Sequence, residues 1–454
     1  MSGLPSDRDS FGSRFGVIAA TAGSAIGLGN IWRFPYVAGE NGGGAFLIVY
    51  LGFVLIIGIP VMLSEFTIGR KAKRNVFGAF RSLAPGKPWF LIGLMGVAAA
   101  FMILAFYTAV AGWTLEYIFQ SVVNGFEGHS AQELNTMFYS FIGSPWRPLL
   151  WFFVFMVFTA IIIMAGVQKG IEKYSKILMP LLLVLLLVLV VRSVTLPGAG
   201  GGISFLFKPD FSKITASTIL EALGQAFFSL SIGMGTLITY GSYIQKSDNL
   251  GKTAVSVAFA DTFIAILAGL AIFPAVFAFN IEPGSGEGLV YITLPNIFQQ
   301  MPGGYFFSLM FFILLGVAAL TSTISVLEVI VAFFSEELRL KRKMATWLAT
   351  SLVSVLGIMC VLSSSTMADA KIFGLTVFDL MNFTSANILL PLGGFFIVIF
   401  VAWFLGREKT KEELSNNGKL KVKYLPFFMF VVKILAPLAI AFIFLQGIGL
   451  IRLS

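Results

Sequence analysis

The sequence predicts an all-α integral membrane protein with eleven transmembrane helices, organised as a 5+5 inverted repeat in which helices 1 and 6 are broken. Three observations support this fold class. Hydrophobic residues make up 57% of the 454 residues and charged residues only 12%, about half the charged share of soluble domains. Eleven continuous apolar stretches are each long enough to cross a bilayer. Glycines interrupt the first and the sixth stretch, which are the matching helices of two five-helix halves.

This composition excludes several classes of protein. A soluble enzyme, a disordered chain and a nucleic-acid-binding protein do not fit 48 phenylalanines and a mean hydropathy of +0.91. The single cysteine, Cys360, and the single histidine, His129, exclude an intrachain disulfide and a metal centre with cysteine or histidine ligands. No nucleophile–base arrangement is visible either, so we expect no enzymatic activity and no nucleic-acid partner.

The elements follow from the apolar stretches, taken in order. The polar first ten residues lack the features of a cleaved signal peptide, so the first helix is expected to be retained. Residues 1–192 are predicted to form the first repeat, 193–405 the second, and 406–454 a cytoplasmic linker and helix 11. The linker 282–303 is expected to carry a short helix over an outer vestibule. The spans are expected at about 13–38, 44–68, 90–122, 149–167, 172–192, 219–243, 253–280, 305–335, 343–363, 375–405 and 425–451.

The basic residues predict the orientation of the chain. They concentrate in alternate linkers, namely 69–88, where Arg70 is one of six bases, 336–343 and 406–424. Short cytoplasmic loops collect lysine and arginine, so we expect the N-terminus inside and, after an odd number of spans, the C-terminus outside. The net charge of +9 is then explained by the orientation of the chain in the membrane, and the expected partner is the lipid bilayer.

The first and sixth spans carry unusual clusters of glycine. Residues 23–30 read GSAIGLGN and residues 229–235 read SLSIGMG. Each glycine inside a helix costs about 1 kcal/mol, and unwound backbone at membrane depth is tolerated only where protein or a cavity satisfies it. One such helix would favour close packing through small residues. A matched pair favours a binding site at the interface of the two repeats.

Motifs along the chain resemble the neurotransmitter:sodium symporter family, including its bacterial leucine transporter. They are GLGNIWRFP at 27–35, ENGGGAF at 40–46, PVMLSE at 60–65, GQAFFSLS at 224–231 and ALTS at 319–322. The resemblance runs through spans 1 to 10 in order. It implies sodium-coupled symport of hydrophobic and aromatic L-amino acids by alternating access in a bacterial inner membrane. The alternatives are a ligand-gated channel or a non-transporting amino-acid sensor on the same scaffold, neither of which could concentrate a substrate.

The resemblance also implies where a zwitterionic substrate binds. Its carboxylate is expected near Leu28, Gly29 and Tyr107, and its ammonium near carbonyl groups of Ala25, Phe228 and Ser231, because a broken helix presents both dipole ends. Gly27 stands where monoamine transporters carry an aspartate, so a substrate with its own carboxylate is favoured. Ser229 is expected to contribute as well. The side-chain pocket is expected to be lined by Ile103, Phe228, Ser231, Met234 and Val326.

Two sodium sites are implied in the same way, since sodium prefers oxygen ligands. The first maps onto the Ala25 carbonyl, Asn30, Ser229 and Asp261. The second maps onto the carbonyls of Gly23, Ile26 and Ala318 and the hydroxyls of Thr321 and Ser322.

Asp261 departs from the family pattern, in which many members have asparagine there and a chloride-binding serine at the position of Ala265. A carboxylate inside an apolar span is costly unless it is paired. We therefore expect Asp261 to supply the negative charge and transport to need no chloride.

The gates are expected at both ends of the pathway. Arg33, with Gln225 and Phe228 nearby, resembles an outer gate, although its usual acidic partner is replaced by Asn382 and the nearest acid is Asp379. At the cytoplasmic end, Arg8 and Glu336 resemble a gate pair, with Phe11 and Tyr243 completing the network.

Overall fold

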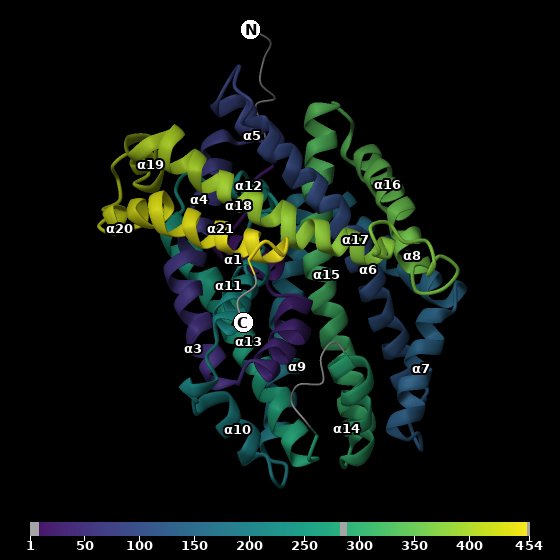
Figure 1. Ribbon diagram of the computed structural model, residues 1–454. Coiled ribbons are helices and arrows are strands. Elements are labelled where there is room, and N and C mark those ends of the chain that lie inside the picture. The colour runs from purple at the N-terminus through teal and green to yellow at the C-terminus, as the bar shows by residue number, and fades with distance from the viewer. Residues whose placement is uncertain (1–8, 282–287, 452–454) are drawn as a thin grey trace.

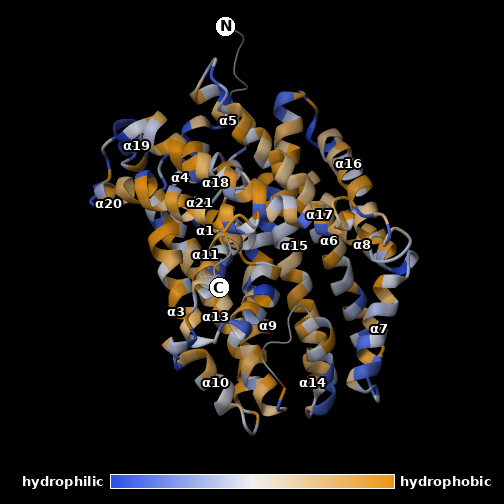
Figure 2. Ribbon diagram, in the orientation of Figure 1, coloured by the Kyte–Doolittle hydropathy of each residue, from blue (hydrophilic) through white to orange (hydrophobic). Residues whose placement is uncertain are grey.

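The computed structural model describes residues 9–281 and 288–451, and the elements within those ranges are helices (Figure 1). The all-α expectation is confirmed. Hydrophobic residues predominate along the long helices of the bundle (Figure 2). Nine helices in this part of the chain are long and apolar enough to cross a membrane by themselves. They are Gly44–Ala72 (α3, η2 and α4), Phe90–Val122 (α6), Trp146–Met164 (α8), Val167–Val194 (η3 and α9), Leu250–Ala278 (α13), Gly304–Glu337 (α15), Arg342–Leu362 (α16), Val377–Leu414 (α17, η6, α18, η7 and α19) and Leu425–Gly447 (α20, η8 and α21).

The first span is broken, as its sequence predicts. Helix α1 covers Arg14–Ala25, and the chain becomes helical again in η1 (Gly29–Arg33) and α2 (Phe34–Glu40). The two parts meet at an angle of 54°. Together they are long and apolar enough to form a tenth span.

The sixth span is also broken, and more widely. Helix α11 covers Ala216–Ser229, and α12 resumes only at Thr236 and ends at Gly241. Between them Ser231, Gly233 and Gly235 have positive φ angles of 54°, 87° and 78°. A Cβ on Gly233 would lie 2.3 Å from the carbonyl oxygen of Leu390, so α18 packs directly against the unwound backbone. Because α11 and α12 are separate short helices, the total of eleven spans stays a prediction, as does the inverted repeat.

Shorter helices lie at the two ends of the bundle. Helix α5 (Val76–Leu83) lies at one end, whereas α7 (Ala131–Gly143), α10 (Gly200–Phe207) and α14 (Leu294–Gln300) lie at the opposite end (Figure 1). A π-helical turn, η5 (Leu289–Thr293), leads into α14, and η4 (Phe211–Lys213) is a single turn. The short helix expected in the linker 282–303 is therefore present over 289–300.

Arg70 forms a structural ion pair, whereas its position in a basic linker indicates only a contribution to the orientation of the chain. It lies in the last turn of α4 with a fully buried side chain. Its Nε lies 2.6 Å from Glu413 Oε1 of α19, and its Nη1 donates to the Asp248 carbonyl. Lys246 also contacts Glu413, at 2.7 Å. This ion pair fixes α19 against α4 and the loop before α13, so Arg70 acts as a structural contact.

Removing one partner of this buried pair should destabilise the protein. Glu413→Ala leaves the buried Arg70 guanidinium without its carboxylate, which typically costs about 3–5 kcal/mol. We expect a clear fall in the thermal unfolding midpoint of the purified protein. The control is the neighbouring Glu412→Ala, because Glu412 is 57% exposed where it pairs with Lys71 and such pairs contribute at most about 1 kcal/mol. Equal midpoints for the two variants would contradict the structural role of Glu413.

Candidate functional site

The two helix breaks meet α6 and α15 around a small internal pocket of about 30 Å³. It lies where unwound backbone from the first and sixth spans offers N–H and C=O groups that no helix uses. Nine of the eleven residues expected to bind substrate line it: Ala25, Gly27, Gly29, Ile103, Tyr107, Phe228, Ser231, Met234 and Val326. Leu28 lies beside it on a larger outer cavity, and Ser229 belongs to a separate polar cluster.

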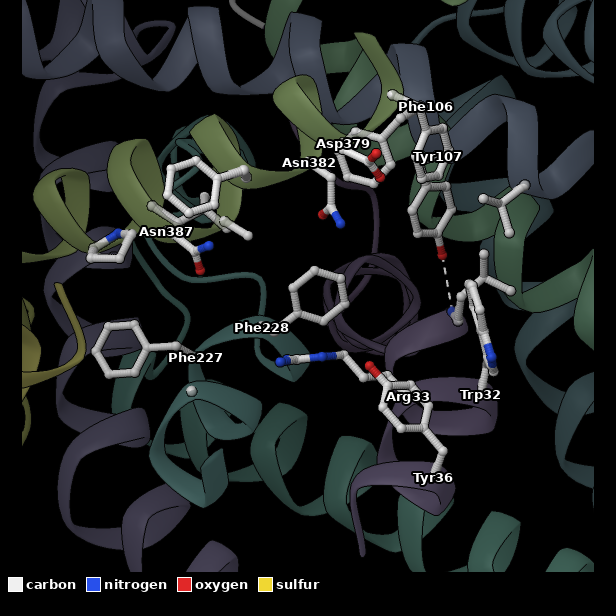
Figure 3. Close-up of a pocket in the computed structure, with 18 of the residues that line it drawn as sticks. Trp32, Arg33, Tyr36, Phe106, Tyr107, Phe227, Phe228, Asp379, Asn382 and Asn387 are labelled. Atoms are coloured by element: carbon white, nitrogen blue, oxygen red, sulfur yellow. Dashed lines mark hydrogen bonds between the residues drawn. The ribbon is translucent and has the colours of Figure 1, made fainter. Parts of the chain in front are cut away.

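Tyr107 connects α6 to the break in the first span. Its hydroxyl accepts a hydrogen bond of 2.9 Å from the backbone N–H of Leu28 (Figure 3). The absence of a side chain at Gly27 makes this approach possible, since a Cβ there would lie 2.7 Å from the Tyr107 hydroxyl and 2.3 Å from Ser322 Oγ. The expectation that Gly27 leaves space is therefore refined, because two hydroxyl groups already occupy the room that an aspartate side chain would need.

Polar groups from other helices satisfy part of the unwound backbone. Ser231 Oγ donates to the Ser24 carbonyl at 2.9 Å and so joins the two breaks directly. The buried carboxylate of Glu65 in α4 accepts from the Gly233 N–H at 2.8 Å. Sequence reasoning did not assign Glu65 a role, although a carboxylate within an apolar span is a visible signal.

The side chains expected at the first sodium site lie together. Asn30 Nδ2 donates to Asp261 Oδ1 at 2.7 Å and to Ser229 Oγ at 3.0 Å, and Ser229 Oγ donates to Asp261 Oδ2 at 2.7 Å. Tyr50 of α3, which was not predicted, adds a hydroxyl 3.4 Å from both Ser229 Oγ and Asp261 Oδ2. All four side chains are buried.

The charge of Asp261 lies among neutral donors. Within the described residues no lysine, arginine or histidine nitrogen lies within 4.0 Å of its carboxylate. A buried carboxylate with hydrogen bonds but no cation retains an uncompensated charge. The cluster therefore offers several oxygen atoms and one negative charge, which is suitable chemistry for a hard monovalent cation.

The residues expected at the second sodium site also meet. Thr321 Oγ1 and Ser322 Oγ of α15 both lie 3.4 Å from the Ile26 carbonyl oxygen, and Thr321 Oγ1 also lies 3.0 Å from the Ala318 carbonyl. A Cβ on Gly23 would lie 3.3 Å from Thr321 Cβ, so α1 passes closely over α15. These oxygen atoms are within hydrogen-bond reach of one another across the break.

A second cavity of about 490 Å³ lies beyond the small pocket, toward α17. Tyr107 and Phe228 line both spaces and so separate them. The Arg33 guanidinium lies 5.0 Å from the Phe228 ring centroid (Figure 3). Its Nη1 donates to Gln225 Oε1 at 3.2 Å. Asp379 lines the same cavity.

Among the described residues, Arg33 forms an ion pair with Glu221, whose Oε2 lies 3.9 Å from Arg33 Nη2. Glu221 lies one helical turn before Gln225 in α11, and the sequence motifs did not include it. Among the described residues, no ion pair within 4.0 Å joins Arg33 to Asp379.

The opposite end of the pocket is closed by buried side chains near the N-terminus. The Phe11 ring packs edge-on against Tyr240 and Tyr243, and the Tyr243 hydroxyl donates to Glu328 Oε1 at 2.6 Å. Arg342 binds both oxygens of Glu328, at 3.1 and 2.5 Å.

The expected pair of Arg8 and Glu336 is only partly visible. Arg8 lies outside the described residues, and Glu336 accepts hydrogen bonds from the backbone and side chain of Asn75, each at 3.0 Å. The ion pair of Glu328 and Arg342 was not predicted. The signal for it was Glu328 itself, an acid inside an apolar span.

Comparison with known proteins agrees with this geometry. The sequence profile of the Sodium:neurotransmitter symporter family matches residues 8–132 and 135–452. YhdH of Bacillus subtilis, described as an uncharacterized sodium-dependent transporter, is 40% identical over 439 residues and covers 97% of both chains. The sodium-dependent serotonin transporter of Drosophila melanogaster is 26% identical over 90% of this chain and 72% of its own.

A solved structure is similar over nearly the whole molecule. The crystal structure of MhsT in complex with L-phenylalanine has a TM-score of 0.89 and 47% sequence identity, and the match covers 97% of this chain and 100% of that one. From the broken helices, the oxygen clusters beside them and these matches, we conclude that the chain belongs to the Sodium:neurotransmitter symporter family and is a multi-pass, sodium-dependent membrane transporter, not an enzyme.

Proposed function

We propose that the protein is a symporter that couples two sodium ions to the uptake of hydrophobic and aromatic L-amino acids by alternating access. The observation that carries this proposal is the position of the small pocket. Ser322 of the second oxygen cluster lines it, and so do Gly29 and Phe228, the sequence neighbours of Asn30 and Ser229 in the first cluster. An amino acid bound there would place its carboxylate near both sodium sites, so that binding of ion and substrate would be linked.

The lining of the pocket supports an apolar substrate. Ile103, Met234 and Val326 are buried and line the pocket together with Phe228, and none of the described residues that line it is charged. A cationic or anionic substrate side chain would lose its hydration there without a partner. MhsT, 47% identical, has been solved in complex with L-phenylalanine, which supports an aromatic substrate for this chain.

The present volume of about 30 Å³ has room for little more than a water molecule. We infer that substrate entry widens the pocket from the outer cavity. Phe228 separates the two spaces, and Met234 has a flexible unbranched side chain that adapts to different shapes. Rotation of these two side chains would join the pocket to the outer cavity without unfolding a helix.

We further propose that the protein resides in a bacterial inner membrane with its N-terminus in the cytoplasm. Arg339, Lys341 and the 406–424 linker belong to the base-rich set whose cytoplasmic position the positive-inside rule predicts. In this orientation the cavity of about 490 Å³ faces outward, and the aromatic cluster around Phe11 closes the pathway to the cytoplasm.

Concentrative uptake tests the proposed function. In proteoliposomes, labelled L-phenylalanine should accumulate above its outside concentration when an inward sodium gradient is imposed, and it should leak out when the gradient is collapsed. Substrate that only equilibrates would indicate a channel. Binding without uptake would indicate a sensor.

Loss of one ligand from either oxygen cluster should weaken sodium activation. We expect Asn30→Ala and Thr321→Ala each to raise the sodium concentration for half-maximal uptake by about tenfold or more, since removing a charge-assisted contact costs about 1.5–3 kcal/mol. Sodium titration of initial uptake rates measures this. The controls are Asn41→Ala and Thr350→Ala, whose side chains bond only to local carbonyls. Unchanged sodium activation in both test variants would exclude the two sites.

A bulkier residue at the pocket floor should alter substrate choice. Met234→Phe stiffens and fills the pocket, so uptake of tryptophan should fall more than uptake of leucine. Competition of unlabelled amino acids against labelled leucine measures the ratio, and Met359→Phe in α16 provides the control outside the pocket. A parent protein that transports lysine or glutamate but not leucine, tyrosine or tryptophan would refute the assignment.

Transport should not require chloride, because Asp261 supplies the negative charge beside the first sodium site. The hydroxyls of Tyr50 and Ser229, which could otherwise bind an anion, are directed at this carboxylate. Replacement of chloride by gluconate at fixed sodium should leave initial uptake unchanged in the parent. The double variant Asp261→Asn with Ala265→Ser should acquire chloride dependence. Uptake by the parent that collapses without chloride would show that Asp261 is not the counter-charge.

A further inference from the structure

A second polar site lies at the outer end of α9. No residue of the breaks in the first and sixth spans lines it. The last turn of α9 carries Arg192 and Ser193 side by side. Both residues line a cavity of about 20 Å³ between α9, α13, α14 and α15. The other walls are apolar, with Phe298 of α14 and Phe311 of α15 among them. The cavity is large enough for one water-sized occupant.

Two buried polar atoms at this cavity have no protein partner. Arg192 Nε and Ser193 Oγ are both buried without a hydrogen bond among the described residues, and Ser193 as a whole is only 2% exposed. Serine hydroxyls at the end of a helix usually donate back to the preceding turn, so an unbonded one is uncommon. A buried polar group without a partner costs about 1–3 kcal/mol, and the two residues that carry these atoms line the same cavity.

The guanidinium of Arg192 is satisfied only on its other side. Its Nη2 donates to the Pro302 carbonyl at 3.3 Å, and its Cζ lies 5.6 Å from the Phe307 ring centroid. No carboxylate in the described part of the chain lies within 4.0 Å of it, whereas Arg147 has Glu116, Arg342 has Glu328 and Arg70 has Glu413. Arg192 is therefore a partly buried positive charge without a described counter-charge.

The chemistry of these two atoms favours an anion over a water molecule. Arg192 Nε can only donate a hydrogen bond, and Ser193 Oγ can donate a second one. A buried water usually makes two to four hydrogen bonds to polar partners, and it would leave the positive charge of the guanidinium uncompensated. An anion needs donors alone and also neutralises the guanidinium. The cavity is too small for a carboxylate ligand or a phosphate.

We propose that this cavity binds a small monovalent anion, chloride under physiological conditions, held by Arg192 Nε and Ser193 Oγ. The site is independent of Asp261 and of the proposed transport function. Bound there, the anion would connect α9 to α14, the outer helix whose Leu294 and Phe298 line the cavity. Its effect would be on the stability of the outer end of the bundle, and initial uptake would remain indifferent to chloride.

Thermal unfolding of the purified full-length protein in detergent tests this proposal. Chloride is exchanged for gluconate at constant sodium concentration and ionic strength. We expect chloride and bromide to raise the unfolding midpoint of the parent by about 2–4 °C, as a ligand that binds only the folded state does. Arg192→Gln should abolish the shift, and Ser193→Ala should weaken the apparent chloride affinity by about tenfold.

Matched controls separate the site from general salt effects. Arg147→Gln and Ser64→Ala should keep the full chloride shift, since Arg147 is paired with Glu116 and Ser64 donates to the Pro60 carbonyl. Initial uptake by the parent is measured in chloride and in gluconate beside the midpoints, so failure of the chloride-independent transport proposal would be distinguishable from failure of this one.

A crystal grown in bromide gives a direct readout in case Arg192→Gln does not fold. An anomalous peak between Arg192 Nε and Ser193 Oγ, weaker in Ser193→Ala, is the expected result. Equal midpoints in chloride and gluconate for the parent would overturn the proposal. So would a chloride shift that persists in a folded Arg192→Gln variant, or an unchanged chloride affinity in Ser193→Ala.

Discussion

The structure depends on backbone polar groups that two helix breaks set free inside the membrane. Unpaired N–H and C=O groups at this depth each cost several kcal/mol, and side chains around the breaks bind several of them. Tyr107 accepts from Leu28, Glu65 accepts from Gly233, and Ser231 donates to Ser24. The groups that remain available are those that a small zwitterion and two cations would use. Binding capacity is therefore a consequence of how the fold tolerates its interruptions.

The distribution of charge divides the molecule into functional and structural parts. Asp261 lies among neutral donors beside the first break, where a cation can compensate it. Arg70 and Glu413, by contrast, compensate each other and fix two helices together. In a sequence, a charged residue of a structural ion pair cannot be distinguished from a buried charged residue without a protein counter-charge. The difference appears only when the partner is known.

Much of the fold and of the pocket could be predicted from sequence because it resides in local patterns. Apolar length predicts the spans, and clustered glycines predict both breaks. What sequence reasoning missed is contact between distant segments. Glu328 is a visible anomaly in an apolar run, but its partner Arg342 follows a helix boundary. The small size of the pocket also escaped prediction, because it depends on the rotamer of Phe228 and on the hydroxyls that surround Gly27.

If ions and substrate share one set of oxygen atoms at the two breaks, the binding of one must strengthen the binding of the other. Two equilibrium titrations of the purified protein measure this linkage. In the first, labelled L-phenylalanine is titrated at several sodium concentrations. In the second, sodium is titrated at several phenylalanine concentrations. Linkage requires each ligand to raise the affinity for the other by the same factor, and we predict a factor well above ten. Phenylalanine binding of equal affinity with and without sodium would exclude a shared set of ligands.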